Sequence, residues 1–111
     1  MPNITYDDFL KVEIRVGKII DVEDFPKARK PAYKLLIDFG EFGRKRSSAQ
    51  ITTFYKKEEL VGRLITAVTN FPPKQIADFI SEVLVLGVVL DNNDVVLLKP
   101  DFDVQLGKRI L

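Results

Sequence analysis

The sequence predicts an all-β fold, a small antiparallel barrel with short helical inserts. About six short apolar segments are separated by turn residues, as in small sandwiches and barrels. The first of these segments is long and interrupted by a glycine, which indicates a bent strand. The chain has 111 residues, 46% of them hydrophobic, enough for one core but not for two. We therefore expect a single domain over residues 1–111.

The first predicted element is a helix of one or two turns beginning after Thr5. Thr5 offers a hydroxyl N-cap, and Asp8 supplies the acid three residues later that completes a capping box. Tyr6, Phe9 and Leu10 form its apolar side, and we expect this helix to plug one end of the barrel. From Val12 to Phe25 the pattern becomes extended, and Gly17 interrupts it. A long strand bent at Gly17 is the simplest account.

The central stretch, residues 33–54, predicts a hairpin followed by a polar face. Apolar residues at positions 33, 35, 37 and 39 repeat with period two, as a half-buried strand requires. Gly40 and Gly43 then permit a tight reversal. A basic and polar run follows at the start of the next strand, comprising Arg44, Lys45, Arg46, Ser47, Ser48 and Gln50. Positive charges beside compact hydrogen-bonding groups suggest a ligand face.

The second half of the chain predicts further short strands. Residues 55–60 read as a short helix that stops near Gly62, and residues 64–70 as a strand ended by Phe71-Pro72-Pro73. Residues 74–79 suggest a turn of helix, because apolar residues recur there at helical spacing. The apolar run 83–90 suits a strand that is buried on both sides or lies at a subunit contact. Residues 91–94 are a hairpin loop before a strand at 95–98, and the apolar residues of the tail 101–111 should be buried.

Together these elements match a five-stranded Greek-key barrel of the OB type, with an N-terminal helical turn and a C-terminal extension. OB barrels bind ligands on an exposed sheet face and its flanking loops. An SH3-like barrel is the main alternative fold.

The composition excludes most catalytic chemistries. The chain has no cysteine and no histidine, so it can form no disulfide, no thiolate or imidazole metal site and no histidine-based triad. The acidic loop 91–94 also lacks the glycine and distal glutamate of an EF-hand. We therefore expect a protein that is not an enzyme and holds no metal or cofactor.

Charge and hydropathy indicate a cytoplasmic protein without membrane insertion. The sequence begins with neither a basic n-region nor an apolar h-region, and no segment approaches the roughly 20 apolar residues that span a bilayer. The formal net charge is only +1, so any electrostatic ligand site must come from local clusters. Two such clusters are Lys27, Arg29 and Lys30, and Arg44 to Arg46. Most acidic residues lie in other segments of the sequence.

Several motifs resemble a known family. Residues 9–19, FLKVEIRVGKI, are similar to the opening of the tRNA-binding OB domain of stand-alone tRNA-binding proteins and some aminoacyl-tRNA synthetases. Asp38-Phe39-Gly40, Leu60-Val61-Gly62-Arg63 and Val68-Thr69-Asn70-Phe71 resemble later motifs of that domain. Residues 47–52, 70–77 and 81–87 resemble one branch of the family, small cytoplasmic proteins described as export-related chaperones.

The resemblance implies a homodimer of OB barrels, with the apolar run and the tail as interface. It also implies that Lys34, Asn70 and Ser81 occupy positions where relatives contact RNA. Two segments depart from the family pattern, Ala49-Gln50-Ile51 and Val83-Leu84, so part of the RNA face has been rewritten. The full set of candidate RNA-binding residues is Lys34, Arg44, Lys45, Arg46, Ser47, Ser48, Asn70 and Ser81.

A chaperone requires apolar residues that are exposed to extended polypeptides. The candidates lie in or beside turns: Phe54, Tyr55, Phe71, Pro72, Ile76 and Phe79. The alternative for each is a place in the barrel core. The sequence thus predicts a chaperone for unfolded or exported polypeptides, with the export machinery as a further partner. A structure-specific tRNA-binding protein is the alternative function, and an interaction module for a synthetase or translocation component is a third.

Overall fold

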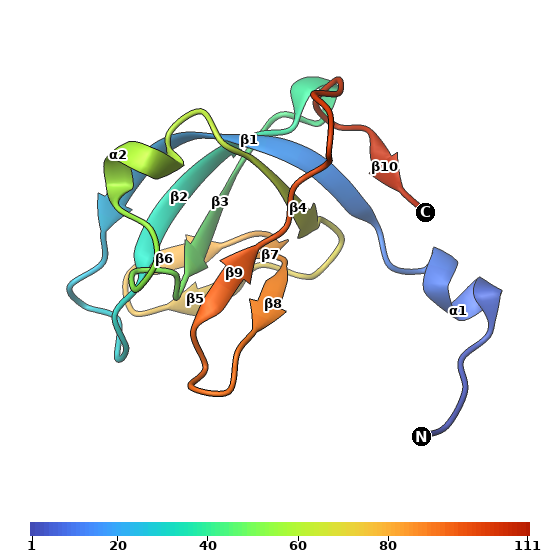
Figure 1. Ribbon diagram of the computed structural model, residues 1–111, viewed down its shortest axis with the longest axis horizontal. Coiled ribbons are helices and arrows are strands. Elements are labelled where there is room, and N and C mark those ends of the chain that lie inside the picture. Colours follow the sequence, from blue (N-terminus) through green and yellow to red (C-terminus); the bar gives the residue numbers. More distant parts are fainter.

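The computed structural model describes residues 1–111 and has the OB-type barrel that the sequence predicts (Figure 1). A curved sheet has the strand order β3-β2-β1-β4-β7, and β10 pairs with β1 outside that path. Two hairpins, β5–β6 and β8–β9, form separate two-stranded sheets. The bounds of the strands are β1 Ile14–Asp24, β2 Tyr33–Asp38, β3 Arg44–Ala49, β4 Leu64–Val68, β5 Lys74–Ile76, β6 Phe79–Ser81, β7 Leu84–Val85, β8 Gly87–Val89, β9 Val95–Leu97 and β10 Arg109–Ile110. The helices are α1 Tyr6–Leu10, the 3-10 turn η1 Gly40–Phe42 and α2 Lys57–Leu60.

Strand β1 is the centre of the sheet, because its two halves pair with different strands. Its first half, Ile14 to Lys18, pairs with β4, and its second half pairs with β2. The irregularity predicted at Gly17 lies instead between Ile19 and Asp21, where the register with β2 shifts. Gly17 has a different role, since a Cβ there would lie 2.6 Å from Cγ2 of Ile37. This glycine allows β1 to pack closely on the core.

The main core lies inside the curved sheet. Alternate residues of β2 point inward, and Leu35, Ile37 and Phe39 are almost fully buried, which confirms the period-two pattern. They pack with residues of β1, β4 and α2, including Ile19, Ile65 and Leu60. A smaller cluster of Phe25, Ala32 and Phe79 is separate from this core, and Ile76 of the β5–β6 hairpin packs against it.

The predicted turns are confirmed. Gly40 and Gly43 have φ of 64° and 84° around the turn between β2 and β3, a region that glycine enters without steric cost. Residues 91–94 close the β8–β9 hairpin, with Asn93 at φ 67°. Thr5 Oγ1 accepts a hydrogen bond from the Asp8 amide, and Asp8 Oδ2 accepts one from the Thr5 amide. Both bonds of the predicted capping box are therefore present.

Two predictions, one about conformation and one about packing, are wrong. Residues 74–79 form the β5–β6 hairpin, not a helix, and Ala77 turns it with φ 52°. Helix α1 buries none of its residues and lies at the periphery, so it plugs no barrel end (Figure 1). The run 83–90 is divided between β7 and β8, and Val88 and Val89 are exposed in the single chain. Burial on both sides within the chain is therefore excluded, and the alternative, a subunit contact, stays a prediction. In the tail, Phe102 and Leu111 are exposed as well.

None of the helices has the length and apolar character needed to cross a membrane.

Candidate ligand-binding groove

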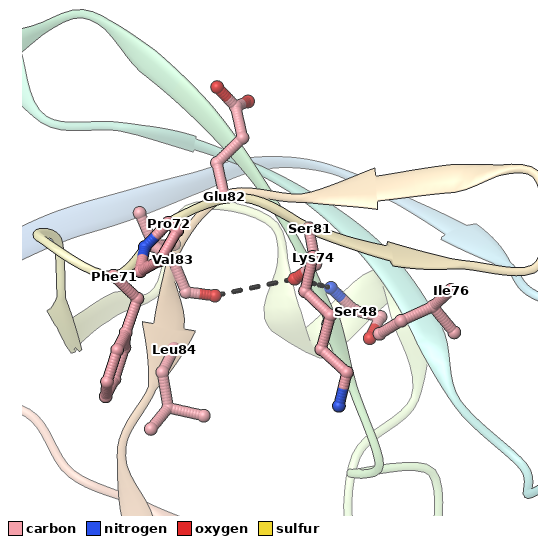
Figure 2. A pocket seen from close by; sticks show the side chains of 9 residues that line it. All are labelled: Ser48, Phe71, Pro72, Lys74, Ile76, Ser81, Glu82, Val83 and Leu84. Carbon is pink, nitrogen blue, oxygen red and sulfur yellow. Dashed lines mark hydrogen bonds between the residues drawn. The ribbon is translucent and has the colours of Figure 1, made fainter.

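The surface has three adjoining hollows that meet at Ser48 on β3. We call the first the apolar hollow. It has a volume of about 290 Å³ and is lined by Ser48, Phe71, Pro72, Lys74, Ile76, Ser81, Glu82, Val83 and Leu84. Figure 2 shows the side chains of Phe71 and Leu84 on the same side of the backbone, with Glu82 directed away from them. The apolar hollow is therefore an accessible hydrophobic surface next to β3.

The second, the basic hollow, has a volume of about 660 Å³ and lies between the loop 26–31 and the β5–β6 hairpin. Its lining residues are Lys27, Ala28, Arg29, Lys30, Ala32, Ser48, Gln50, Lys74, Gln75, Ile76 and Ala77. Ser48, Lys74 and Ile76 line both the apolar and the basic hollow. We call the two hollows together the groove.

The third hollow, of about 370 Å³, lies between the end of β3 and the strands β7, β8 and β9. Eight of its 11 lining residues are hydrophobic, and it shares Ser48 and Leu84 with the apolar hollow. It extends the apolar surface from the groove toward the β8–β9 hairpin.

Hydrogen bonds between β3 and residues 81–83 hold the floor of the groove. The Glu82 amide donates to the Arg46 carbonyl at 2.7 Å, and the Arg46 amide donates to Glu82 Oε1 at 3.0 Å. The Ser48 amide donates to Ser81 Oγ at 3.1 Å, and this hydroxyl donates to the Val83 carbonyl (Figure 2). Ser81 therefore positions two backbone segments of the groove.

An ion pair joins the two sides of the basic hollow. Lys27 Nζ lies 2.8 Å from Asp78 Oδ2, which connects the loop 26–31 to the turn of the β5–β6 hairpin. The hydrogen bond and the charge of Asp78 raise the pKa of Lys27 above its usual value. The hydrogen bond from Lys27 lowers the pKa of Asp78 in turn. Both groups are solvent-exposed, so the pair orients the loop more than it stabilises the fold.

Six of the eight candidate RNA-binding residues lie in three environments. Ser48 and Ser81 line the apolar hollow. Lys34 Nζ lies 5.0 Å and 5.6 Å from the ring centroids of Phe25 and Phe79, and the Arg46 guanidinium lies 5.5 Å from the Phe79 ring. On β3, Arg44 is exposed while Lys45 is half-buried.

The other two candidates form hydrogen bonds within the chain, Ser47 as a buried residue and Asn70 as an exposed one. Ser47 is fully buried, and its hydroxyl donates to the Ser48 carbonyl, so its predicted place on an exposed ligand face is wrong. It belongs to the inward-facing set of β3, because side chains alternate along a strand. Asn70 accepts from the Glu13 amide and donates to the Lys11 carbonyl. The side-chain amide of Asn70 therefore links β4 to the segment between α1 and β1.

Acidic and basic residues that lie in separate segments of the sequence are brought together in the sheet. Directly paired residues project from the same face, and the register places Asp21 beside Leu36 and Leu36 beside Arg46. Two residues further along β1, Glu23 is paired with Lys34, and this pair projects from the same face. The face that carries Arg46 and Lys34 therefore also carries carboxylates. The basic hollow, in contrast, has no carboxylate among its lining residues.

The candidate peptide-binding residues also divide. Phe71, Pro72 and Ile76 line the apolar hollow, and Phe71 is 53% exposed. Phe79, in contrast, is 7% exposed and packs edge-on against Phe25 with ring centroids 5.5 Å apart. Its predicted exposure in a groove is wrong, because the β5–β6 hairpin turns its ring inward.

The two remaining candidates lie outside the groove. Tyr55 is half-buried, and its hydroxyl accepts a hydrogen bond from the Leu97 amide. Its carbonyl accepts from the Tyr33 hydroxyl. Phe54 is 50% exposed but lines none of the three hollows described above. Lys74 and Leu84 are groove residues that the sequence reasoning missed. Lys74 could have been found as the cation directly after the Phe71-Pro72-Pro73 turn.

Comparison with known proteins agrees with this architecture. The family model described as "Putative tRNA binding domain" matches residues 14–109. The chain belongs to this family. Its sequence is 38% identical over 107 residues, 96% of the chain, to the methionine–tRNA ligase of Nanoarchaeum equitans, and 37% identical over 99% of the chain to that of Thermococcus kodakarensis. The chain spans only 13% and 14% of the length of these two ligases.

Solved structures identify the branch of the family. The structure of the chaperone CsaA from Bacillus anthracis has a TM-score of 0.95 and 50% identity, covering 99% of this chain and 100% of that one. The CsaA chaperone protein of Picrophilus torridus has a TM-score of 0.91 and 57% identity, over 98% and 100% of the two chains. A MetRS related protein from Pyrococcus horikoshii has a TM-score of 0.88 at 25% identity and covers both chains fully. The predicted resemblance to the chaperone branch of the tRNA-binding domain family is confirmed.

Proposed function

We propose that this member of the tRNA-binding domain family is a CsaA-like chaperone that binds unfolded or exported polypeptides. The observation that carries the proposal is the apolar hollow, where Phe71 and Leu84 expose about half of their surface beside Pro72. Exposed apolar surface of this kind marks interaction sites in soluble proteins. The similarity to CsaA chaperones over nearly the whole of both chains supports the same reading.

In this proposal the protein binds and does not catalyse. Its residues 1–111 act as one domain in the cytoplasm, without a cofactor, and deliver polypeptides to the export machinery. The apolar hollow would hold a hydrophobic side chain of the client, while the hydrogen-bonded floor at Ser48 and Ser81 keeps the hollow open. A preformed hollow reduces the entropy that is lost when the client binds.

The functional unit is proposed to be a homodimer. The β8–β9 hairpin projects from the rest of the molecule in Figure 1. Exposed apolar residues lie on this hairpin and directly after its strands: Val88, Val89, Leu90, Val96 and Leu98. A second copy of the chain would cover this surface. Val89→Asp should shift the molecular mass in sedimentation equilibrium to that of a monomer. Val61→Asp, at an exposed valine beside α2, is the matched control, and a monomeric wild type would contradict the proposal.

Fluorescence anisotropy tests polypeptide binding directly. A labelled unstructured peptide and labelled tRNA are each titrated with the protein over a range of salt concentrations. We expect peptide binding that tolerates salt, because burial of apolar surface provides most of its free energy. Phe71→Ser should weaken it, whereas Phe54→Ser, an equally exposed phenylalanine outside the groove, should not. Absence of peptide binding by the wild type would refute the proposed function.

Structure-specific tRNA binding is the second candidate function. It is supported by the exposed Arg44 and Arg46 on β3 and by the similarity to part of the methionine–tRNA ligases. Its signature in the same titrations would be tight tRNA binding that weakens steeply with salt, because each neutralised phosphate releases counterions. That result without any peptide signal would replace the chaperone with a tRNA-binding protein.

A further inference from the structure

We propose that the groove selects extended polypeptide segments in which an apolar side chain has acidic residues close by in the sequence. The apolar side chain would enter the apolar hollow, and the acidic side chains would lie over the basic hollow. This inference rests on the proposed function and specifies the class of client that the same site accepts.

The basic hollow carries a net positive charge. Its lining includes Lys27, Arg29, Lys30 and Lys74 and no carboxylate. Lys27 is neutralised by Asp78, but Arg29, Lys30 and Lys74 are exposed and form no ion pair within the chain. Three uncompensated cations around one concave surface attract an acidic ligand and repel a basic one. The charge complement of this surface is therefore an acidic segment.

The apolar hollow does not cancel this preference. Glu82 is its only carboxylate, and Oε1 of Glu82 already accepts from the Arg46 amide and lies 3.8 Å from the Arg46 guanidinium. Figure 2 shows this side chain directed away from Lys74 and Leu84. A client residue in the apolar hollow thus meets mainly Phe71, Pro72 and Leu84, and the electrostatic selection comes from the basic hollow.

The connection of the hollows determines the order of the client residues. Lys74 and Ile76 line both hollows, and they project from the same face of β5 because alternate residues of a strand do so. An extended client rises about 3.3 Å per residue. Two client side chains a few positions apart would therefore reach the apolar hollow and the basic hollow at the same time. The apolar and acidic residues of the client must therefore be near neighbours in sequence.

A nucleic acid is the less suitable occupant of this groove. Its phosphates would be attracted to the same cations, but the apolar hollow presents mainly hydrocarbon and ring surface to them. Burying phosphate oxygens against such a surface is costly without hydrogen-bond donors. A nucleic acid would have to place its bases in the apolar hollow, where Phe71 is the only aromatic ring on which they could stack, whereas a polypeptide can fill this hollow with any apolar side chain.

Three labelled unstructured peptides test the inference. They share one apolar core of leucines and differ only in the flanking residues, which are aspartates, asparagines or lysines. Their affinities for the wild-type protein are compared by fluorescence anisotropy at low and high salt. Several exposed charge pairs would form, and each contributes little energy. We therefore expect the aspartate peptide to bind about tenfold more tightly than the lysine peptide. The ratio of the two affinities should be smaller at high salt.

The matched variants are Lys74→Glu in the groove and Lys108→Glu at an exposed lysine outside it. Both change the net charge equally, and circular dichroism checks that both fold. Lys74→Glu should abolish the preference for the aspartate peptide, and Lys108→Glu should retain it. Equal affinities for the three peptides, tightest binding of the lysine peptide, or equal effects of the two variants would overturn the inference and leave the chaperone function standing. Binding of none of the peptides would overturn the proposed function itself, and tRNA binding in that case would favour the second candidate.

Discussion

The clearest test of the structure compares two phenylalanines that the sequence could not distinguish. Phe79 is 7% exposed, and Phe71 is 53% exposed. A phenylalanine buries roughly 200 Å², and at about 25 cal/mol per Å² the loss of the Phe79 ring would cost about 4–5 kcal/mol. Residual burial in the unfolded chain lowers this by about 10–40%. We expect Phe79→Ala to reduce the free energy of unfolding by about 3 kcal/mol, in the lower part of the range of about 3–5 kcal/mol for such substitutions.

The same arithmetic gives Phe71→Ala about half of that cost, because about half of its surface is already in water. Urea unfolding followed by circular dichroism measures both values. The protein concentration must be the same in each experiment, since association would add to the apparent stability. Equal costs for the two substitutions, or a cost below about 1 kcal/mol for Phe79→Ala, would refute the inward orientation of the Phe79 ring.

Three further predictions concern other parts of the molecule. The double variant Arg44→Ala, Arg46→Ala should weaken tRNA binding and flatten the slope of log affinity against log salt by about 1 for each lost phosphate contact; an unchanged slope would remove these residues from any RNA site. Gly17→Ala should cost about 1–3 kcal/mol in urea unfolding by overpacking, since its Cβ would lie 2.6 Å from Ile37 and 2.7 Å from Phe39, and a neutral effect would show that the core can yield there. The carboxyl of Asp78 should titrate by NMR below its ordinary pKa of 3.8, and Lys27→Met should return it toward that value. Because the folded pKa is the lower one, the Lys27–Asp78 interaction contributes above pH 3.8 and is lost as the pH falls through the folded pKa; an Asp78 pKa unaffected by Lys27→Met would contradict the pair.

Local features of the sequence were sufficient for the elements that local interactions determine. The capping box of Thr5 and Asp8 acts within one helical turn. Gly40 and Gly43 adopt positive φ because the reversal between β2 and β3 requires it. The alternation through Leu35 and Ile37 reflects burial of one face of β2. The motifs that resemble the tRNA-binding domain also predicted the family correctly.

Short segments were ambiguous for a physical reason. Residues 74–79 place Ile76 and Phe79 three positions apart, which fits a helical turn. The structure instead pairs Ile76 with Phe79 across a hairpin. A strand of three residues is too short for its period to be recognised, so only the pairing partner decides its conformation.

The candidate site shows the same division. The sequence by itself identified Ser48 as a ligand-face candidate and Phe71, Pro72 and Ile76 as groove candidates, and the structure brings these four residues together. Only the tertiary structure decided that Ser47 faces inward while Ser48 lines the groove, because a shift of one residue in strand register reverses every side chain. Register also placed Asp21 in the same row as Arg46. Burial and charge pairing in this barrel depend on contacts between distant segments, and those contacts exist only when the sheet has closed.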